Sequence, residues 1–335
     1  MAREQFVTWN PGPGSLAVVE QADAICREYE RQGYDLTLRQ LYYQFVSRGL
    51  VANTQQSYKR IGDIVNNGRL AGLLDWDHIV DRTRNLSSPS HWASPTEIVE
   101  AVAAQYRIDK RADQEVRVEV WVEKEALAGV VQRAARGADV AHFSCRGYVS
   151  QSELHAAAER FQAYIQGGQK VVVVHLGDHD PSGLDMTRDI ATRVGRFLTV
   201  GLDLLDPGEP SDPEFEAYLL GPGAAVGEFD TFGDEPWFQV RRIALNWDQV
   251  QTYNPPPNPA KMTDSRAGDY VAKYGRESWE LDALDPEVLN TLIADEVDAW
   301  TQPDRFDGLR RRERTERAQL TAVKDNWDAI VEEFA

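Results

Sequence analysis

The chain has 335 residues, 42% of them hydrophobic, with 54 acidic and 36 basic side chains and a formal net charge of −18. This length and composition predict a globular protein with room for two cores. No run of 18 apolar residues and no basic-then-apolar start is present, which argues against a membrane partner and leads us to expect a cytoplasmic protein. The net charge makes the whole chain a poor electrostatic partner for nucleic acid.

The first third of the sequence predicts three helices, near residues 15–32, 38–45 and 55–68. Thr37 precedes the second helix and forms a capping-box pattern with Gln40 three residues later. The apolar residues of this helix recur at i, i+3, i+4 and i+7 and predict a buried stripe: Leu38, Leu41, Tyr42 and Phe45. Three helices in this order suit a helix-turn-helix or winged-helix module.

Two adjacent tyrosines on the second helix are expected to have different surroundings. Tyr42 belongs to the buried stripe, whereas Arg39 and Tyr43 are four residues apart on a more polar face. We therefore expect Tyr43 to project from the helix with a guanidinium beside it. Residues 36–74 carry five basic side chains against one acidic side chain, so this segment is locally positive on an acidic chain.

A charged linker at residues 109–114 marks a boundary between two predicted domains, 1–110 and 111–335. Beyond it, apolar strands alternate with amphipathic helices, the pattern of a parallel sheet in an α/β domain. Residues 207–235, rich in Gly, Pro and acids, predict an insertion or loop. A further strand near 238–245 leads into a helical C-terminal extension.

Acidic side chains end two of the predicted strands. Alternating valines predict a strand that ends at Glu123, and the apolar run at 171–176 predicts a second strand followed by Asp178 and Asp180. The carboxyl ends of parallel strands meet at one edge of a sheet, where open α/β sheets bind ligands. Three carboxylates there repel one another unless a cation offsets their charge, and their oxygens suit Mg²⁺ or Mn²⁺. The alternative is a polar turn in which an Asp caps the next helix.

These acidic segments resemble the Toprim domain, the metal-binding module of topoisomerases, primases and some nucleases. The closer resemblance is to the A subunit of topoisomerase VI and its relative, the meiotic double-strand-break transesterase. It rests on three segments: Val122-Glu123-Lys124-Glu125-Ala126, Arg146-Gly147-Tyr148 and Asp178-His179-Asp180-Pro181-Ser182-Gly183. The resemblance implies a Rossmann-like parallel sheet and a site in which Glu123, Asp178 and Asp180 hold Mg²⁺ or Mn²⁺. One departure is Tyr148-Val149, where Tyr-Pro is expected.

The tyrosine helix carries a second resemblance to the same families. Arg39-Gln40-Leu41-Tyr42-Tyr43 resembles their winged-helix motif, in which the second tyrosine attacks a DNA phosphate and becomes linked to the 5′ end. The resemblance implies that Tyr43 is the nucleophile, that Arg39 steadies the phosphate, and that Glu123 belongs to the catalytic set. A phenol with a pKa of about 10 is a weak nucleophile until a metal or cation favours its anion.

The resemblance covers roughly residues 36–200 and implies metal-dependent cleavage of double-stranded DNA. Each tyrosine would cut one strand, so a double-strand break requires a homodimer. The sequence has no Gly-rich phosphate loop ending in Lys-Ser/Thr, so strand passage would require a separate ATPase subunit. Two alternatives remain open. One is a Toprim nuclease that hydrolyses DNA with metal-activated water, as in the Wadjet plasmid-defence system. The other is a non-catalytic DNA-binding protein.

Overall fold

The computed structural model describes residues 3–80, 89–202 and 237–334, so the loop expected at 207–235 lies outside the described residues. The N-terminal part contains helices α1 (Pro13–Arg31), α2 (Leu38–Ser47), α3 (Gln55–Leu70) and α4 (Pro95–Gln105). The middle part contains β1 (Val116–Val122), η1 (Glu125–Leu127), α5 (Ala128–Ala138), β2 (Ala141–Ser144), α6 (Gln151–Gln166), β3 (Lys170–Leu176), α7 (Pro181–Gly201) and β4 (Phe238–Ala244). The C-terminal part contains α9 (Trp247–Tyr253), β5 (Asn258–Pro259), α10 (Ala267–Tyr274), β6 (Glu277–Ser278), η2 (Leu281–Ala283), α11 (Pro286–Ala299), α12 (Pro303–Asp325) and α13 (Trp327–Phe334). None of the described helices combines the length and the apolar character that a membrane span requires.

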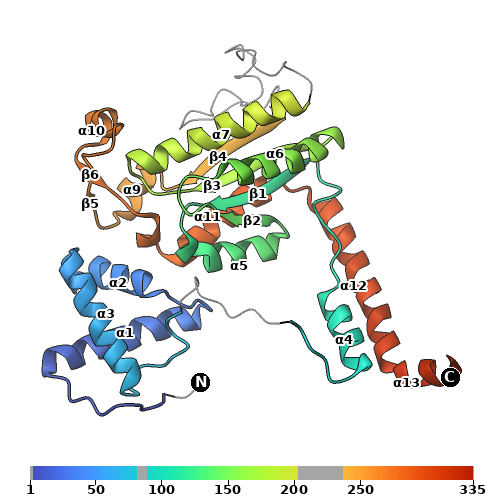
Figure 1. Ribbon diagram of the computed structural model, residues 1–335, viewed down its shortest axis with the longest axis horizontal. Coiled ribbons are helices and arrows are strands. Elements are labelled where there is room, and N and C mark those ends of the chain that lie inside the picture. The colour runs from blue at the N-terminus through green and yellow to red at the C-terminus, as the bar shows by residue number, and fades with distance from the viewer. Residues whose placement is uncertain (1–2, 81–88, 203–236, 335) are drawn as a thin grey trace.

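A four-stranded parallel sheet forms the centre of the fold, in the order β2-β1-β3-β4 (Figure 1). Strands β1 and β3 pair along their whole length, from Val116 opposite Lys170 to Val122 opposite Leu176. The predicted mixed α/β class and parallel sheet are therefore confirmed. Outside this sheet, β5 and β6 form a short antiparallel pair in the C-terminal extension.

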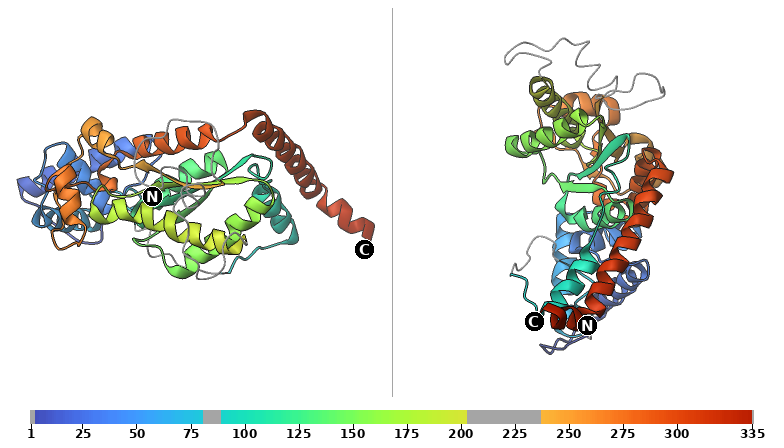
Figure 2. Two further views of the ribbon diagram at one scale, coloured as in Figure 1. Left: turned by 90° about the horizontal axis from the view of Figure 1, so that it is seen from above. Right: turned by 90° about the vertical axis from the view of Figure 1, so that its right-hand side faces the viewer.

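Helices cover both faces of the sheet (Figures 1 and 2). On one face, Val118 and Val120 of β1 and Val174 of β3 belong to the core that also contains residues of α5 and α11. On the opposite face, Trp121 and Val173 pack with residues of α6 and α7. Burial on both sides explains why these strands are rich in valine over their whole length.

The N-terminal helices share their core with the sheet. Helix α2 begins with the predicted capping box: Thr37 Oγ1 accepts from the Gln40 N–H at 3.2 Å, and Gln40 Oε1 accepts from the Thr37 N–H at 2.8 Å. Leu41 and Phe45 are fully buried in the same cluster as Leu281 of η2, against which α2 packs. One apolar core therefore runs from the tyrosine helix into the C-terminal extension.

Helix α4 packs along α12, away from α1, α2 and α3 (Figure 1). The buried residue of α12, Glu313, accepts hydrogen bonds from Lys110 Nζ at 2.5 Å and from the Ile108 N–H at 2.9 Å. The segment that joins α4 to β1 is thus fastened to the C-terminal helix. The domain boundary at residue 110 stays a prediction.

The start of α7 lies so close to the end of β3 that only glycine fits at one position. A Cβ on Gly183 would lie 2.2 Å from the Asp178 carbonyl oxygen. Asp180 caps the helix, its Oδ1 accepting from the Gly183 N–H at 2.6 Å, and Pro181 occupies the first turn. The connection between strand and helix is therefore specified by the chemistry of a helix start.

Gly183→Ala is expected to lower the free energy of unfolding by about 2 kcal/mol, because the new methyl group meets backbone that is already packed. Urea denaturation followed by circular dichroism measures the effect. The control is Gly308→Ala in α12, where an added Cβ meets no atom within 4 Å. It should be neutral or stabilising by up to about 1 kcal/mol. Equal stability of the two variants would contradict the clash.

Candidate functional site

The ends of β1 and β3 bring two of the predicted acids together. Because Val122 lies opposite Leu176, Glu123 and the turn after β3 emerge at the same edge of the sheet. Glu123 Oε2 accepts a hydrogen bond from the Asp178 N–H at 2.8 Å. Gly177 leaves room for this contact, since a Cβ there would lie 2.9 Å from the same oxygen. The expected meeting of the two strand ends is confirmed.

Lys124, the residue after Glu123, lies among three carboxylates. Its Nζ is 2.9 Å from Asp178 Oδ1, 2.8 Å from Glu280 Oε2 and 2.9 Å from Asp282 Oδ1. Asp178 Oδ1 also accepts a hydrogen bond from the Leu281 N–H at 2.8 Å. The C-terminal extension therefore contacts both the strand-end acid and the lysine beside it.

Burial changes the protonation of the strand-end acids. Removal from water raises the pKa of Asp178 to about 7, although the Lys124 ammonium opposes the rise. The same removal raises the pKa of Glu123, against the hydrogen bond from the Asp178 N–H. Arg242 lies beneath the turn and donates to the carbonyl oxygens of Gly177 at 2.8 Å and Asp178 at 2.6 Å. These carboxylates therefore lie where additional positive charge would favour their ionised forms.

In each predicted metal ligand, one carboxylate oxygen accepts the hydrogen bonds named here and the second oxygen takes no part in them. Glu123 uses Oε2 and Asp178 uses Oδ1, while Asp180 Oδ1 accepts from Ser182 Oγ at 2.8 Å and from the Gly183 N–H. The remaining oxygens are hard donors, so the donor set suits Mg²⁺ or Mn²⁺. Within the described residues, however, no three His, Cys, Asp or Glu side chains are grouped as a metal site requires. The three-ligand site stays a prediction.

Tyr43 is buried, so the expectation that it projects from a polar face is wrong. Only 3% of its surface is exposed, much as for Tyr42 at 4%, which is core as predicted. The cause is tertiary, because the C-terminal extension covers this side of α2. Asn258 Nδ2 donates to the Tyr43 hydroxyl at 3.4 Å from a position 215 residues away along the chain. Helical spacing cannot reveal a covering segment that is so distant.

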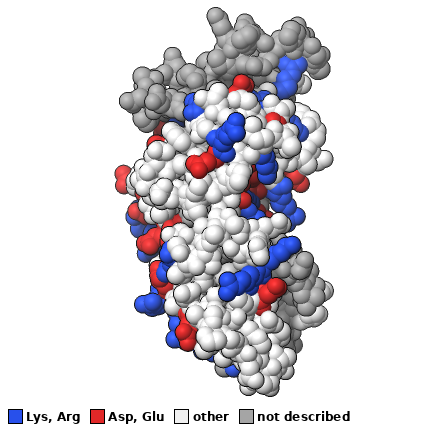
Figure 3. Space-filling view, turned by 90° about the vertical axis from the view of Figure 1, so that its left-hand side faces the viewer, with Lys and Arg blue, Asp and Glu red and all other residues white. Residues whose placement is uncertain are grey.

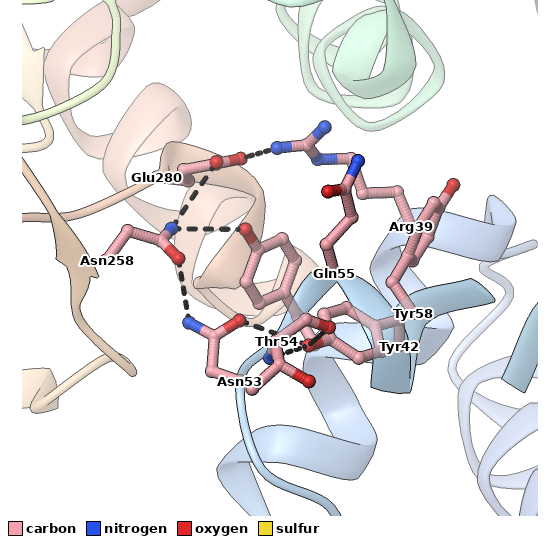
Figure 4. A pocket seen from close by; sticks show the side chains of 9 residues that line it. Arg39, Tyr42, Asn53, Thr54, Gln55, Tyr58, Asn258 and Glu280 are labelled. Carbon is pink, nitrogen blue, oxygen red and sulfur yellow. Dashed lines mark hydrogen bonds and ion pairs between the residues drawn. The ribbon is translucent and has the colours of Figure 1, made fainter. Parts of the chain in front are cut away.

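A cavity of about 260 Å³ opens beside Tyr43 (Figure 4). Residues of α2, the start of α3 and the C-terminal extension line it: Arg39, Tyr42, Tyr43, Asn53, Thr54, Gln55, Tyr58, Asn258 and Glu280. The guanidinium carbon of Arg39 lies 5.8 Å from the centroid of the Tyr43 ring, as their spacing predicts. Arg39 also pairs with Glu280 and, through Nε, with Asp282 Oδ2 at 2.9 Å. The predicted nucleophile and phosphate-binding arginine thus share one pocket.

A continuous series of polar contacts joins the tyrosine to the strand-end acids. Asn258 Nδ2 donates both to the Tyr43 hydroxyl and to Glu280 Oε1, at 3.4 and 3.3 Å. Glu280 pairs with Lys124, and Lys124 pairs with Asp178. The two motifs that the sequence places in different predicted domains therefore belong to one network within a single chain.

The sequence assigns no role to four residues of this network: Lys124, Asn258, Glu280 and Asp282. Lys124 lies in a motif segment in which only the preceding Glu has an implied function. The two acids flank the fully buried Leu281 at the start of η2, and no periodicity in the sequence signals that both contact Lys124 and Arg39. Asn258 lies in a proline-rich run that gives no indication of its contact with the tyrosine.

The surroundings of Tyr43 disfavour its anion. Burial raises the pKa of Tyr43, and the nearby carboxylates of Asp282 and Glu280 raise it further. The amide of Asn258 and the guanidinium of Arg39 act in the opposite direction. The phenol is therefore neutral in this arrangement, and its activation requires more positive charge or less negative charge nearby.

Comparison of the chain with protein-family models, with curated proteins and with solved structures gave no match in any of the three.

The raised pKa of Asp178 predicts that this residue's contribution to stability is lost as pH rises from about 4 to about 7. In this range the folded protein holds the Asp178 proton and the unfolded chain releases it, so the free energy of unfolding decreases with pH. Asp178→Asn removes this contribution, while that of Glu123, whose pKa burial also raises, remains. Urea denaturation of both proteins in metal-free buffer measures the difference, which should change by up to about 1.4 kcal/mol per pH unit. Parallel pH curves for the two proteins would contradict the prediction.

Proposed function

We propose that this protein cleaves double-stranded DNA in a metal-dependent reaction with Tyr43 as the nucleophile. The observation that carries the proposal is the polar network from Tyr43 through Asn258, Glu280 and Lys124 to Asp178. A tyrosine that only packs in the core would not require hydrogen bonds and ion pairs that link it to the acids at the strand ends. In this proposal α1, α2 and α3 form a winged-helix-like module, and the parallel sheet is a Toprim domain.

In the proposed reaction, the Tyr43 oxygen bonds to a backbone phosphorus as the bond to the 3′ oxygen breaks. Tyr43 loses its proton and the departing 3′ oxygen gains one, which leaves a 3′-hydroxyl and a 5′-phosphotyrosyl link. Arg39 holds phosphate oxygens with its planar guanidinium. Glu123, Asp178 and Asp180 would hold Mg²⁺ or Mn²⁺, which when bound supplies positive charge against the developing negative charge.

A double-strand break in this scheme requires two tyrosines, and thus a homodimer. Strand passage between the broken ends would require an ATPase, which the proposal assigns to a separate subunit. The network that supports the proposal lies within one chain, so each protomer would carry its own tyrosine and its own acids.

Exposed basic side chains lie on α3, whose first turns line the pocket. Figure 3 shows Lys and Arg side chains, with Asp and Glu side chains among and beside them, on the side where α2, α3 and α10 lie in Figure 1. Exposed basic residues of these elements include Lys59 and Arg60 on α3 and Lys273 on α10. Local positive charge of this kind supports contact with the DNA backbone despite the net charge of −18.

The burial of Tyr43 favours a second candidate function, hydrolysis of DNA by metal-activated water. Tyr43 is 3% exposed and its pKa is raised, so the phenol is both covered and neutral in this arrangement. A hydrolytic nuclease of the Toprim type would need the strand-end acids and not the tyrosine.

Tyr43→Phe separates the two candidates. Wild-type protein incubated with supercoiled plasmid and Mg²⁺ or Mn²⁺, then quenched with denaturant, should yield DNA covalently attached at its 5′ ends. The variant should lose adduct by about 100-fold or more, because its ring lacks the attacking oxygen. Tyr42→Phe is the control, because it also removes a tyrosine hydroxyl. That hydroxyl accepts a hydrogen bond from the Thr54 N–H at 2.9 Å and is not the proposed nucleophile. Cutting without adduct by all three proteins would favour hydrolysis, and no cutting by the wild type would contradict both candidates.

Divalent metal is expected to stabilise the protein through the strand-end acids. Mn²⁺ at about 100 times its Kd should raise the free energy of unfolding by about 2.7 kcal/mol. Asp180→Asn should lose most of this gain, because an amide replaces a charged ligand while still capping α7. Asp189→Asn, further along the same helix, is the control. Thermal melts with and without Mn²⁺ test the site, and an unchanged Mn²⁺ effect in Asp180→Asn would count against it.

A further inference from the structure

One carboxylate oxygen in the pocket is held by two cations at once. Glu280 Oε2 lies 2.8 Å from Lys124 Nζ and also accepts a hydrogen bond from Arg39. The other oxygen, Oε1, accepts from Asn258 Nδ2 at 3.3 Å (Figure 4). A guanidinium, an ammonium and an amide therefore converge on a single anionic group.

This set of donors is the one that protein sites use for phosphate. Arginine binds two oxygens of an oxyanion with its planar fork, and lysine adds a compact positive charge. The Asn258 amide that contacts Glu280 also contacts the Tyr43 hydroxyl, at 3.4 Å. An anion in the place of the Glu280 carboxylate would thus share a hydrogen-bond donor with the phenol.

Glu280 and Asp282 each contact both cations, but they differ in how firmly they are fixed. Asp282 is fully enclosed and lies 2.9 Å from both Lys124 Nζ and Arg39 Nε. The Glu280 side chain is 23% exposed and borders the cavity. If Glu280 swings out, Asp282 and Asp178 still hold the cations in position.

The backbone around Glu280 is anchored, so its side chain can leave while the segment stays in place. The neighbouring residue Trp279 exchanges two backbone hydrogen bonds with His179, at 2.8 and 3.0 Å. The His179 ring is packed among four aromatic rings of the extension: Trp247, Tyr270, Tyr274 and Trp279. The Leu281 N–H on the other side is bonded to Asp178 Oδ1 at 2.8 Å.

We propose that Arg39 and Lys124 form a phosphate-binding subsite, and that Glu280 occupies it in the free protein as an internal substitute for a DNA backbone phosphate. DNA must displace the Glu280 carboxylate to bind beside Tyr43. The free protein is thus held in a self-blocked state that binding of the substrate relieves. This inference rests on the proposed function in taking DNA as the ligand, and it does not require that the DNA be cut.

Glu280→Gln tests the subsite, because the amide keeps the shape of the side chain and removes the competing charge. Fluorescence anisotropy of a labelled 30-base-pair duplex, in EDTA so that no cleavage occurs, gives the Kd. The variant should bind about tenfold more tightly than the wild type. The matched control is Glu277→Gln, an exposed residue of β6 with the same change in charge, which should stay within about twofold of the wild type.

The tighter DNA binding expected of Glu280→Gln must depend on Arg39 and Lys124, whose charges the Glu280 carboxylate no longer offsets. Adding Lys124→Gln to Glu280→Gln should return the Kd to the wild-type value or weaker. In Glu280→Gln the slope of log K against log salt should steepen by about 0.9, the value for one more phosphate contact. Circular dichroism melts establish that each variant is folded.

Three outcomes would overturn the subsite: an unchanged Kd in Glu280→Gln, an equal gain in Glu277→Gln, or no DNA binding by any of the proteins. Its failure is distinguishable from failure of the cleavage proposal. Tighter binding of Glu280→Gln without a tyrosine adduct in Mn²⁺ would support the subsite and count against Tyr43 as nucleophile. An adduct in the wild-type protein, with no gain in DNA affinity in Glu280→Gln, would support Tyr43 as the nucleophile and count against the subsite.

Discussion

Buried carboxylates at the junction of the sheet and the C-terminal extension impose the constraint on which the rest of the structure depends. Asp178, Glu280 and Asp282 repel one another where little water screens them. They are held together by Lys124 at the end of β1 and by Arg39 on α2. Removal of the fully enclosed member, Asp282, leaves both cations without their shared partner, so the three segments are linked through this residue. The ion pairs of the junction thus join the tyrosine helix to the C-terminal extension, which in turn contacts Lys124 at the end of β1.

The same junction joins residues of the two predicted domains, 1–110 and 111–335, whose boundary stays a prediction. Helix α2 packs on η2, and one apolar core includes residues of α1, α2, α5 and α11. A tyrosine that the sequence assigns to one module is covered by residues that follow the other. The burial of Tyr43 and its raised pKa are consequences of this packing, not properties of the helix that carries it.

Local patterns in the sequence predicted the elements of the fold, and distant contacts decided the details of the site. The alternating valines of β1 and the capping box at Thr37 depend on neighbours within a few residues, so both could be predicted from the sequence. The meeting of Glu123 with Asp178 followed from parallel pairing, a general property of such sheets. The covering of Tyr43 depended on a residue 215 positions away, and no periodicity encodes that contact. The packing of α4 along α12 was hidden for the same reason.

The tight connection between β3 and α7 explains part of the motif after β3 without any reference to the reaction. Asp180 as the cap, Pro181 in the first turn and Gly183 without a Cβ are what this tight passage from strand to helix needs. Ser, Thr or Asn would cap this helix as Asp180 does, so the connection accounts for Pro181 and Gly183 and not for a carboxylate at the cap. Information about the reaction is therefore concentrated in the three acids, Glu123, Asp178 and Asp180. A chain that shared only Pro181 and Gly183 would share the architecture of this corner and not its reactivity.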